Sequence, residues 1–260
     1  MRWEDLTSPE VDALDRDATV LVVPIGSVEQ HGRHMPLGTD SMLAHGVALG
    51  AAARLAPGSI AVLPPPWYGY SPHHMRFPGT VTLSVATLSA LVGDIVGSVV
   101  AHGFRRIVLV NGHGGNAGIV DVLSADLGAR HAGAARIAGL TYFKLAQAAI
   151  ARLRESRPGG MGHACEFETA MMLHLHPGIV HMERAVTAYP ETGSPFLSTD
   201  LLNGSRVATY IDFKDLSEIG TFGDPGLASP EKGARFFDTV CDELAAFITD
   251  FRSWPIKGDK

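Results

Sequence analysis

One stretch near the start of the chain decides the fold: Thr19-Val-Leu-Val-Val-Pro24-Ile-Gly-Ser-Val-Glu29-Gln-His31-Gly-Arg-His34-Met-Pro-Leu-Gly-Thr-Asp40. Its apolar, β-branched first part is typical of a buried strand, and its second part is a polar loop rich in glycine, acids and histidines. Open α/β sheets bind their ligands beyond the carboxyl ends of the strands. The loop is therefore the first candidate for chemistry.

Further apolar runs along the chain predict strands, and the segments between them predict helices. The strands are expected at Thr19–Pro24, Ser59–Leu63, Arg106–Val110 and Arg136–Leu140. Apolar residues at helical spacing predict helices at Ser41–Leu55, Thr87–His102, Asn116–His131, Tyr142–Arg154, Glu166–His176 and about Ser229–Phe251. Alternation of this kind implies βαβ units in an α/β fold with a mostly parallel sheet. The segment Tyr189–Gly226 lacks helical periodicity and is expected to lay loops and short strands over the site.

Composition narrows the class of protein. The chain has 260 residues, of which 46% are hydrophobic and 18% charged, enough apolar content to bury a full core. We find no repeat or linker and expect a single domain over residues 1–260. A net charge of -6 gives no broad basic surface, so no nucleic-acid partner is expected.

Location is inferred from the apolar segments and the cysteines. The most apolar stretches, Ala18–Ile25 and Leu88–Phe104, are too short or too interrupted to cross a bilayer, so no membrane partner is expected. The first residues lack the pattern of an export signal. Two cysteines, Cys165 and Cys241, form no disulfide framework, which favours a reducing, cytoplasmic location.

The first polar cluster contains candidate metal ligands. Residues two apart on an extended chain face the same side, so Glu29 and His31 can aim a carboxylate and an imidazole at one point. Asp40 precedes a predicted helix and can either cap it or bridge two cations with its two oxygens. His34 is open to three interpretations: a ligand, a substrate contact or a hydrogen-bond partner of another site residue.

Two later clusters contain further candidate metal ligands. Asn111-Gly-His113-Gly-Gly-Asn116 follows a predicted strand, so His113 also lies at a strand's carboxyl end. In His163-Ala-Cys165-Glu-Phe-Glu168, the histidine and the last glutamate converge only if His163 lies before the helix, because five residues correspond to about 140° of helical rotation. Cys165 is expected to serve packing. Mixed imidazole and carboxylate donors suit Zn²⁺ or Mn²⁺, and the inventory fits a two-metal site that activates water.

These clusters resemble the creatininase (creatinine amidohydrolase) family. The resemblance includes Tyr68-Gly-Tyr-Ser71 with Phe77-Pro-Gly-Thr80, and Gly223-Asp-Pro225 with Ala228-Ser-Pro-Glu-Lys-Gly233, and covers about residues 18 to 245. It implies a three-layer α/β/α sandwich, assembly as a homohexamer, and a metal-dependent hydrolase that opens a C–N bond in a small-molecule substrate.

The resemblance also implies roles for individual residues. Two divalent ions per subunit, Zn, Mn or Fe, would lie at the metal positions Glu29, His31, Asp40, His113 and Glu168, with Asp40 as the bridge. His163 and Glu168 would be catalytic, His163 by orienting substrate or moving a proton, while Glu168 could be either a ligand or a proton relay. Substrate contacts are expected from His34, Ser71, His74, Gly114 and Gly115, and His73 lies in the same loop.

Departures from the family pattern argue against creatinine itself as substrate. Gly115 stands where creatininases carry an acidic residue, and Pro158-Gly159-Gly160 replaces a region containing tryptophan. The substrate could be bulkier, or one metal more weakly held. Related activities are deformylation of a pyrimidine nucleotide, trimming of a peptide-derived cofactor precursor and ring opening of an oxidised inositol.

Two hypotheses that assign the chain to other functional classes stay open. Gly112-His-Gly114-Gly-Asn-Ala117 satisfies a dinucleotide-binding pattern, but the acidic residue expected at the end of the next strand is missing. The chain could also be a non-catalytic small-molecule-binding protein with a degenerate metal site, a possibility raised by Gly115.

Overall fold

The apolar runs form a fully parallel central sheet. The computed structural model describes residues 1–256. Its main sheet has four strands in the order β2-β1-β3-β4, and every neighbouring pair is parallel. The strands are β1 (Val20–Ile25), β2 (Ile60–Val62), β3 (Arg106–Asn111) and β4 (Arg136–Thr141). The predicted strands are thus confirmed.

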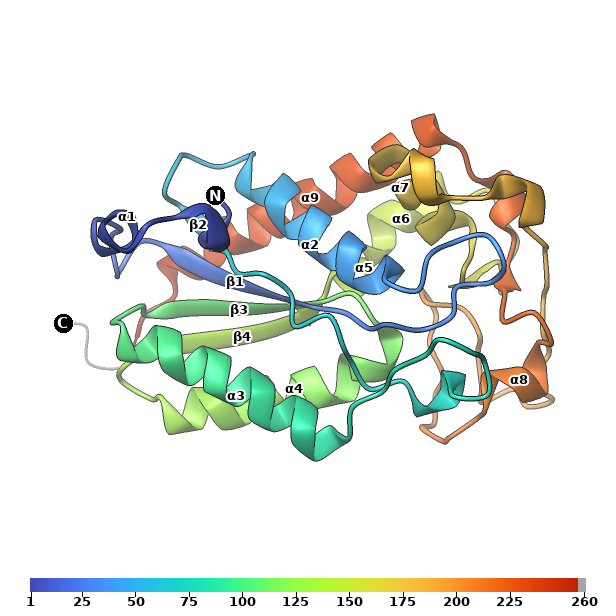
Figure 1. The fold of residues 1–260 in the computed structure, drawn as a ribbon, viewed down its shortest axis with the longest axis horizontal. Coiled ribbons are helices and arrows are strands. Elements are labelled where there is room, and N and C mark those ends of the chain that lie inside the picture. Colours follow the sequence, from blue (N-terminus) through green and yellow to red (C-terminus); the bar gives the residue numbers. More distant parts are fainter. Residues whose placement is uncertain (257–260) are drawn as a thin grey trace.

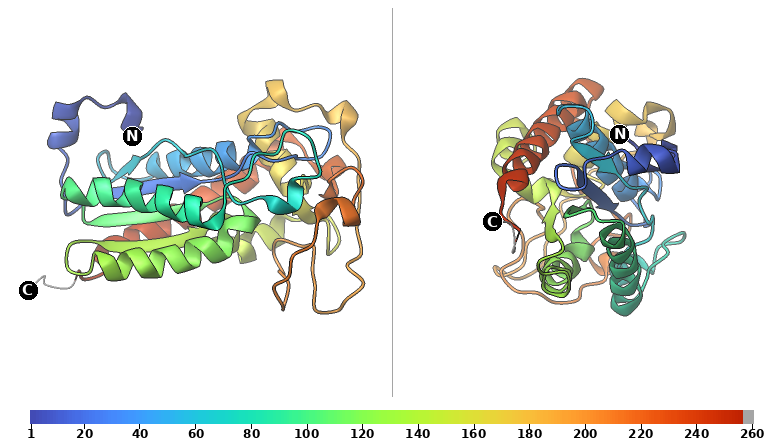
Figure 2. Two further views of the ribbon diagram at one scale, coloured as in Figure 1. Left: turned by 60° about the horizontal axis from the view of Figure 1, so that its bottom comes forward. Right: turned by 90° about the vertical axis from the view of Figure 1, so that its left-hand side faces the viewer.

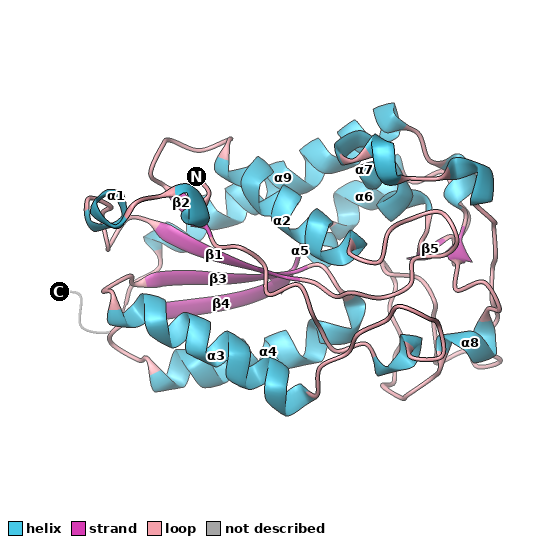
Figure 3. Cartoon of the chain, in the orientation of Figure 1, coloured by secondary structure: helices cyan, strands magenta, loops and turns pink. Residues whose placement is uncertain are grey.

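Helices cover both faces of this sheet, as Figures 1 and 3 show. Because successive side chains of a strand point to opposite faces, Val20 and Val22 of β1 join one hydrophobic core while Leu21, Val23 and Ile25 join another. The first core is closed by α2 (Thr39–Ala52), α5 (Tyr142–Leu145), α6 (Gln147–Leu153), α7 (Glu166–Leu175) and α9 (Pro230–Ser253). The second is closed by α3 (Val85–Ala101) and α4 (Ala117–Arg130). The three-layer α/β/α prediction is confirmed.

The helix predicted at Tyr142–Arg154 is wrong in one respect, because it is two helices. Ala146 ends α5 and begins α6 with φ -91° and ψ 12°, outside regular helix geometry. Tyr142, Phe143 and Ile150 all lie in the same core. We attribute the break to this shared burial, since a bend brings both ends of the segment against the core.

Short elements gather beyond the carboxyl ends of the strands (Figure 2). Strand β5 (Met161–His163) pairs antiparallel with β6 (Phe222–Gly223), and α8 (Phe213–Leu216) precedes β6 in a long irregular segment. The short helix α1 (Ser8–Asp12) lies near the opposite end. No helix within residues 1–256 has both the length and the apolar character required to cross a membrane.

Strand order explains where a site can form. The chain leaves β1 for α2 on one face of the sheet and leaves β3 for α4 on the other. Where adjacent parallel strands send their connections to opposite faces, a crevice opens beyond their carboxyl ends. Ile25 of β1 pairs with Asn111 of β3, so the two polar loops that follow these strands begin side by side.

Candidate metal centre

The crevice between β1 and β3 holds a buried cluster of acids and histidines. Glu29 and His31 come from the loop after β1, Asp40 from the first turn of α2 and His113 from the loop after β3; all four are buried. One ligand atom from each of Glu29, His31 and Asp40 lies within 4.8 Å of the others. The structure therefore brings together side chains that the sequence separates by up to 84 positions, from residue 29 to residue 113.

Asp40 faces two different imidazoles with its two oxygens. Its Oδ1 lies 3.1 Å from Nε2 of His31, and its Oδ2 lies 2.9 Å from Nδ1 of His113. A carboxylate in this arrangement can bind one cation through each oxygen. The geometry is that of a potential bridging ligand.

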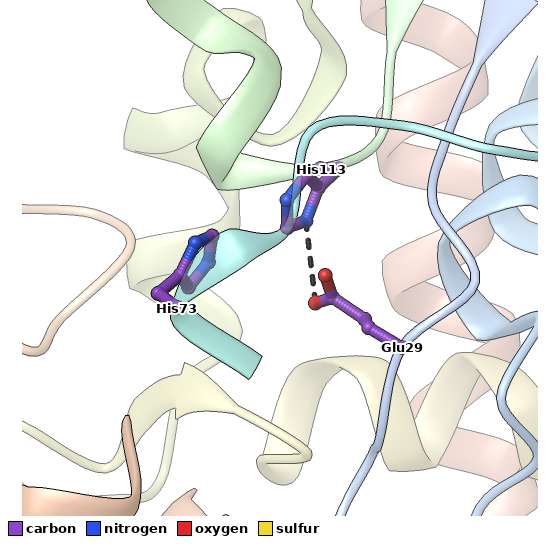
Figure 4. A group of neighbouring side chains, drawn as sticks. All are labelled: Glu29, His73 and His113. Atoms are coloured by element: carbon purple, nitrogen blue, oxygen red, sulfur yellow. Dashed lines mark ion pairs between the residues drawn. The ribbon is translucent and has the colours of Figure 1, made fainter. Parts of the chain in front are cut away.

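Glu29 is surrounded by imidazoles. Its Oε1 lies 3.2 Å from Nε2 of His74, 3.3 Å from Nδ1 of His113 and 3.7 Å from Nδ1 of His163. Figure 4 shows the His113 ring directed at this carboxylate, with the His73 ring beside it. A second donor group therefore converges on Glu29.

The ring nitrogens are oriented by backbone carbonyls. Nδ1 of His31 donates to the Glu29 carbonyl at 3.1 Å, Nε2 of His113 donates to the Tyr70 carbonyl at 3.1 Å, and Nε2 of His163 donates to the Gln30 carbonyl at 2.6 Å. In each ring the other nitrogen faces the cluster. Metal-binding histidines are commonly oriented by a hydrogen bond of this kind at the outer nitrogen.

Several buried polar atoms of the cluster make no well-aligned hydrogen bond among the described residues, although Oε1 of Glu29 and Oδ2 of Asp40 lie within ion-pair distance of Nδ1 of His113. The atoms without such a bond are both carboxylate oxygens of Glu29, Oδ2 of Asp40 and Nδ1 of His34. A buried oxygen without such a bond is destabilising, and a cation would satisfy it. Mixed carboxylate and imidazole donors suit Zn²⁺, Mn²⁺ or Fe²⁺. The residues present fit divalent metal ions.

Without a cation, protons on the imidazoles balance the carboxylates. Burial disfavours the charged form of Glu29, yet His113 and His74 hold the pKa of its carboxyl well below the usual range. Burial likewise opposes the imidazolium of His31, but Asp40 raises its pKa to about 9. The pKa of His113 is raised well above its usual value despite burial, chiefly by Glu29 and Asp40. The cluster is thus built to hold positive charge.

Glu168 and His163 reach the cluster from α7 and β5 instead of from the loops after β1 and β3. His163 ends β5 and Glu168 lies in the first turn of α7, so the histidine precedes the helix as the spacing required. Ligand atoms of His31, His163 and Glu168 lie within 4.8 Å of one another. Burial raises the pKa of Glu168 to about 7 and, together with His31, lowers the pKa of His163 to about 3. The Cys165 thiol donates to Oε2 of Glu168 at 3.7 Å, a contact that the packing interpretation did not include.

The histidines and serine predicted to touch substrate lie buried against the cluster. Ser71 bonds to Ser27 and lies 3.1 Å from Nε2 of His113. Nδ1 of His74 accepts from the Gln30 amide at 2.9 Å, which leaves its Nε2 for Glu29. His34 shares a 2.9 Å hydrogen bond with Thr169 of α7.

The two glycines predicted to touch substrate differ in their surroundings. A Cβ at Gly114 would meet nothing within 4 Å, whereas one at Gly115 would lie 2.4 Å from Nε2 of His113. Gly114 therefore borders open space, and Gly115 permits close packing around His113.

Sequence reasoning missed two residues. Gln30 lies between two candidate ligands in the sequence and connects His74, His163 and the Gly220 carbonyl, to which its amide donates at 3.2 Å. Its position in the motif was the available signal. Phe213 of α8 packs its ring 4.3 Å from that of His74. Nothing in the sequence around this residue indicates that it reaches the site.

Known proteins resemble this chain over most of its length. The family model for creatinine amidohydrolase, Creatininase, matches residues 4–248. The chain is 32% identical over 258 residues to the mycofactocin precursor peptide peptidase of Mycobacterium tuberculosis, covering 96% of this chain and 93% of that protein. It is 35% identical to the creatinine amidohydrolase of Pseudomonas putida, covering 89% of each. It is 26% identical to the 3-dehydro-scyllo-inosose hydrolase of Thermotoga maritima, covering 95% of this chain and 82% of that protein.

The chain also resembles solved structures of creatininases. A crystal structure of creatinine amidohydrolase (creatininase) superposes with a TM-score of 0.80 at 31% identity, covering 98% of each chain. Matching creatininase structures include an Mn form and a Zn–Zn form of a mutant. With a family model matched over nearly its whole length and relatives above 30% identity, this chain belongs to the creatininase family of hydrolases.

Proposed function

We propose that the chain is a hydrolase that holds two divalent cations and cleaves a C–N bond of a small molecule. One cation would be bound by Glu29, Asp40 and His113, and the other by His31, Asp40 and Glu168. The observation that carries this proposal is Asp40, whose two oxygens lie 3.1 Å and 2.9 Å from imidazoles of the two ligand groups. The buried carboxylate oxygens of Glu29 and Asp40 that make no well-aligned hydrogen bond support it further.

The chain's own residues supply orientation and proton transfer. When bound, divalent cations act as Lewis acids that polarise a carbonyl and activate water. His163 donates its Nε2 hydrogen to the Gln30 carbonyl, and its lowered pKa keeps the ring neutral, so Nδ1 would hold a proton only in passing it to the departing nitrogen. Glu168, whose burial raises its pKa to about 7, could accept a proton from water if it is not needed as a ligand.

For the substrate we propose a cyclic amide, formamide or similar amide. The named relatives act on different molecules, so trimming of a peptide and ring opening of a keto-inositol stay as alternatives for the same site. Creatinine itself is disfavoured by the residues at 115 and 158–160. Gly114, with open space where a side chain would begin, is a position at which a bulkier substrate could approach.

Metal content tests the proposal. Elemental analysis of chelator-free, untagged protein should find about two equivalents per chain. Asp40→Ala should lose both, together with any hydrolysis found in a screen of cyclic amides and formamides. One equivalent in the wild type would require a mechanism around a single Lewis acid. No metal in either protein, or hydrolysis unchanged in Asp40→Ala, would favour a non-catalytic small-molecule-binding protein.

We further propose one domain over residues 1–260, a cytoplasmic location and a homohexamer. The cysteines are buried and unbridged, which is compatible with a reducing compartment. Large apolar side chains that are exposed on the isolated chain, among them Trp67 and Val81, are candidates for burial between subunits. Light scattering of the eluting protein should give six times the mass of one chain.

A further inference from the structure

His73 lies next to the Glu29 group but has no role in the two ligand sets above. It belongs to the short 3-10 helix Pro72–His74, which follows β2 in the chain. Ligand atoms of Glu29, His73 and His113 all lie within 4.8 Å of one another. Figure 4 shows the three side chains around a common space, with His73 entering from the side opposite the β1 loop.

The ring nitrogens of His73 are available to bind a ligand. Within residues 1–256, no hydrogen bond reaches either of them. Every other histidine of the cluster uses at least one ring nitrogen in a hydrogen bond: His31, His34, His74, His113 and His163. His73 is also only half-buried, so one nitrogen can face the cluster while the other meets water.

Packing holds the His73 ring in place. It stacks nearly parallel to His113, with ring centres 5.5 Å apart and planes 7° apart, and Phe213 packs against it at 4.9 Å. A Cβ on Gly115 would lie 2.8 Å from Cε1 of His73, so the absence of a side chain at 115 makes room for this ring. The ring is thus fixed beside His113 by contacts that leave its nitrogens free.

We propose that His73 is a further nitrogen ligand of the cation that Glu29 and His113 hold. This inference rests on the proposed function, because it concerns one of the two proposed cation sites. With two imidazoles, that site should prefer a borderline metal such as Zn²⁺ over the harder Mn²⁺ more strongly than a site with one imidazole. Gly115 is then required for the ligand set, since a side chain there would occupy the space of the His73 ring.

Metal titration of His73→Phe tests this inference. Phenylalanine keeps a ring between His113 and Phe213 but has no nitrogen, so it separates ligation from packing. Zn²⁺ and Mn²⁺ are each titrated into wild type, His73→Phe and His73→Ala by competition with a chromophoric chelator at fixed pH. In both variants one of two equivalents should bind at least about tenfold more weakly, with a larger loss for Zn²⁺ than for Mn²⁺.

His102→Phe is the matched control, because His102 is an exposed histidine at the end of α3. It should bind both equivalents as the wild type does, and circular dichroism should show all variants folded. If His73→Phe binds both equivalents with wild-type affinity while wild type binds two, His73 is not a ligand and only this inference fails. Weakening in His73→Ala alone also overturns it, since the role is then packing. A wild type that binds no metal overturns the proposed function itself.

Discussion

The hydrogen bond of His163 assigns its two ring nitrogens to different tasks, so that its role in catalysis can be tested apart from metal binding. Its Nε2 is committed to the Gln30 carbonyl at 2.6 Å, and its Nδ1 is the nitrogen available to a substrate. Removing the ring should leave the five proposed metal ligands in place. We therefore expect His163→Ala to lower kcat by about 10² to 10⁴-fold while the metal content stays near that of wild type.

Steady-state kinetics and elemental analysis of the same preparation check this prediction. Equal losses of kcat and metal would identify His163 as a ligand instead. His163→Gln offers a second variant, since an amide can keep the bond to Gln30 but cannot carry a proton at neutral pH.

The grouping of Glu29 with His31 was predictable because an extended loop places alternate residues on one side, and both come together in the structure. The link between His163 and Gln30 was not predictable, because it joins residues 133 positions apart through a backbone carbonyl. Periodicity carries no information about which carbonyl a ring nitrogen will meet. Phe213 was missed for a similar reason: its position depends on tertiary contacts of an irregular segment.

At the scale of elements, α8 is tethered to the site by its own side chains. Arg76 pairs with Asp215 and lies 3.7 Å from Asp212, and Nζ of Lys214 lies 4.8 Å from the centre of the Phe77 ring. These contacts hold Phe213 against the histidines. We expect Phe213→Ala to lower kcat/KM about tenfold or more, because the histidine rings lose the contact that positions them.

Phe196→Ala provides the control for this prediction. Phe196 is an exposed aromatic residue of the same long segment, and its ring packs against Arg206 instead of the site. Its substitution should leave kcat/KM unchanged. An unchanged kcat/KM in Phe213→Ala would mean that α8 only covers the site.

The crossing of α7 and α9 depends on a glycine. A Cβ on Gly233 would lie 1.9 Å from the carbonyl oxygen of Ala170, a backbone atom that cannot turn aside. Gly233→Ala should therefore lower the free energy of unfolding by about 1–3 kcal/mol and, because Ala170 lies two residues from Glu168, reduce metal content. Gly128→Ala in α4 meets nothing within 4 Å and should stabilise the protein by about 0.4–1 kcal/mol.

Urea denaturation and elemental analysis of both variants check this prediction. Equal free energies of unfolding for the two variants would show that α7 and α9 can move apart without loss of stability. The sequence predicted the existence of both helices from their apolar spacing. It did not predict their crossing point, because a close approach of two backbones leaves no periodic pattern.

At the scale of the whole molecule, the parallel sheet followed from alternating strand and helix patterns, and the three layers followed from the family resemblance. The strand order β2-β1-β3-β4 was not predicted. The break at Ala146 was not predicted either, since the segment's composition favours helix on both sides. Charge balance at the site is also a property of the whole fold, because Asp40 and His31 meet only after β1 and α2 have packed.

This charge balance makes stability depend on pH and metal together. The pKa of His31 in the metal-free fold, about 9, exceeds its ordinary value of 6.5. Its contribution to stability is therefore complete below about pH 6.5 and is lost as the pH rises through about 9. Metal-free protein should melt at a lower temperature at pH 9 than at pH 7, whereas stabilisation by added Mn²⁺ should grow over the same interval as protons leave the ligands.

Thermal unfolding with and without Mn²⁺ across this range measures both trends. A melting temperature of the metal-free protein that rises toward pH 9 would contradict the proton balance at His31. Stabilisation by Mn²⁺ that does not depend on pH would show that the ligands bind metal without releasing protons.

The contact between Gly233 and Ala170 also bears on how the site is made during synthesis. A ribosome releases the segments that carry Glu29, Asp40 and His113 long before it releases α9, against which α7 must pack to hold Glu168 in place. A nascent chain thus carries part of its ligand set while the rest has no support. Metal capture should consequently be a late event, completed after α9 has emerged.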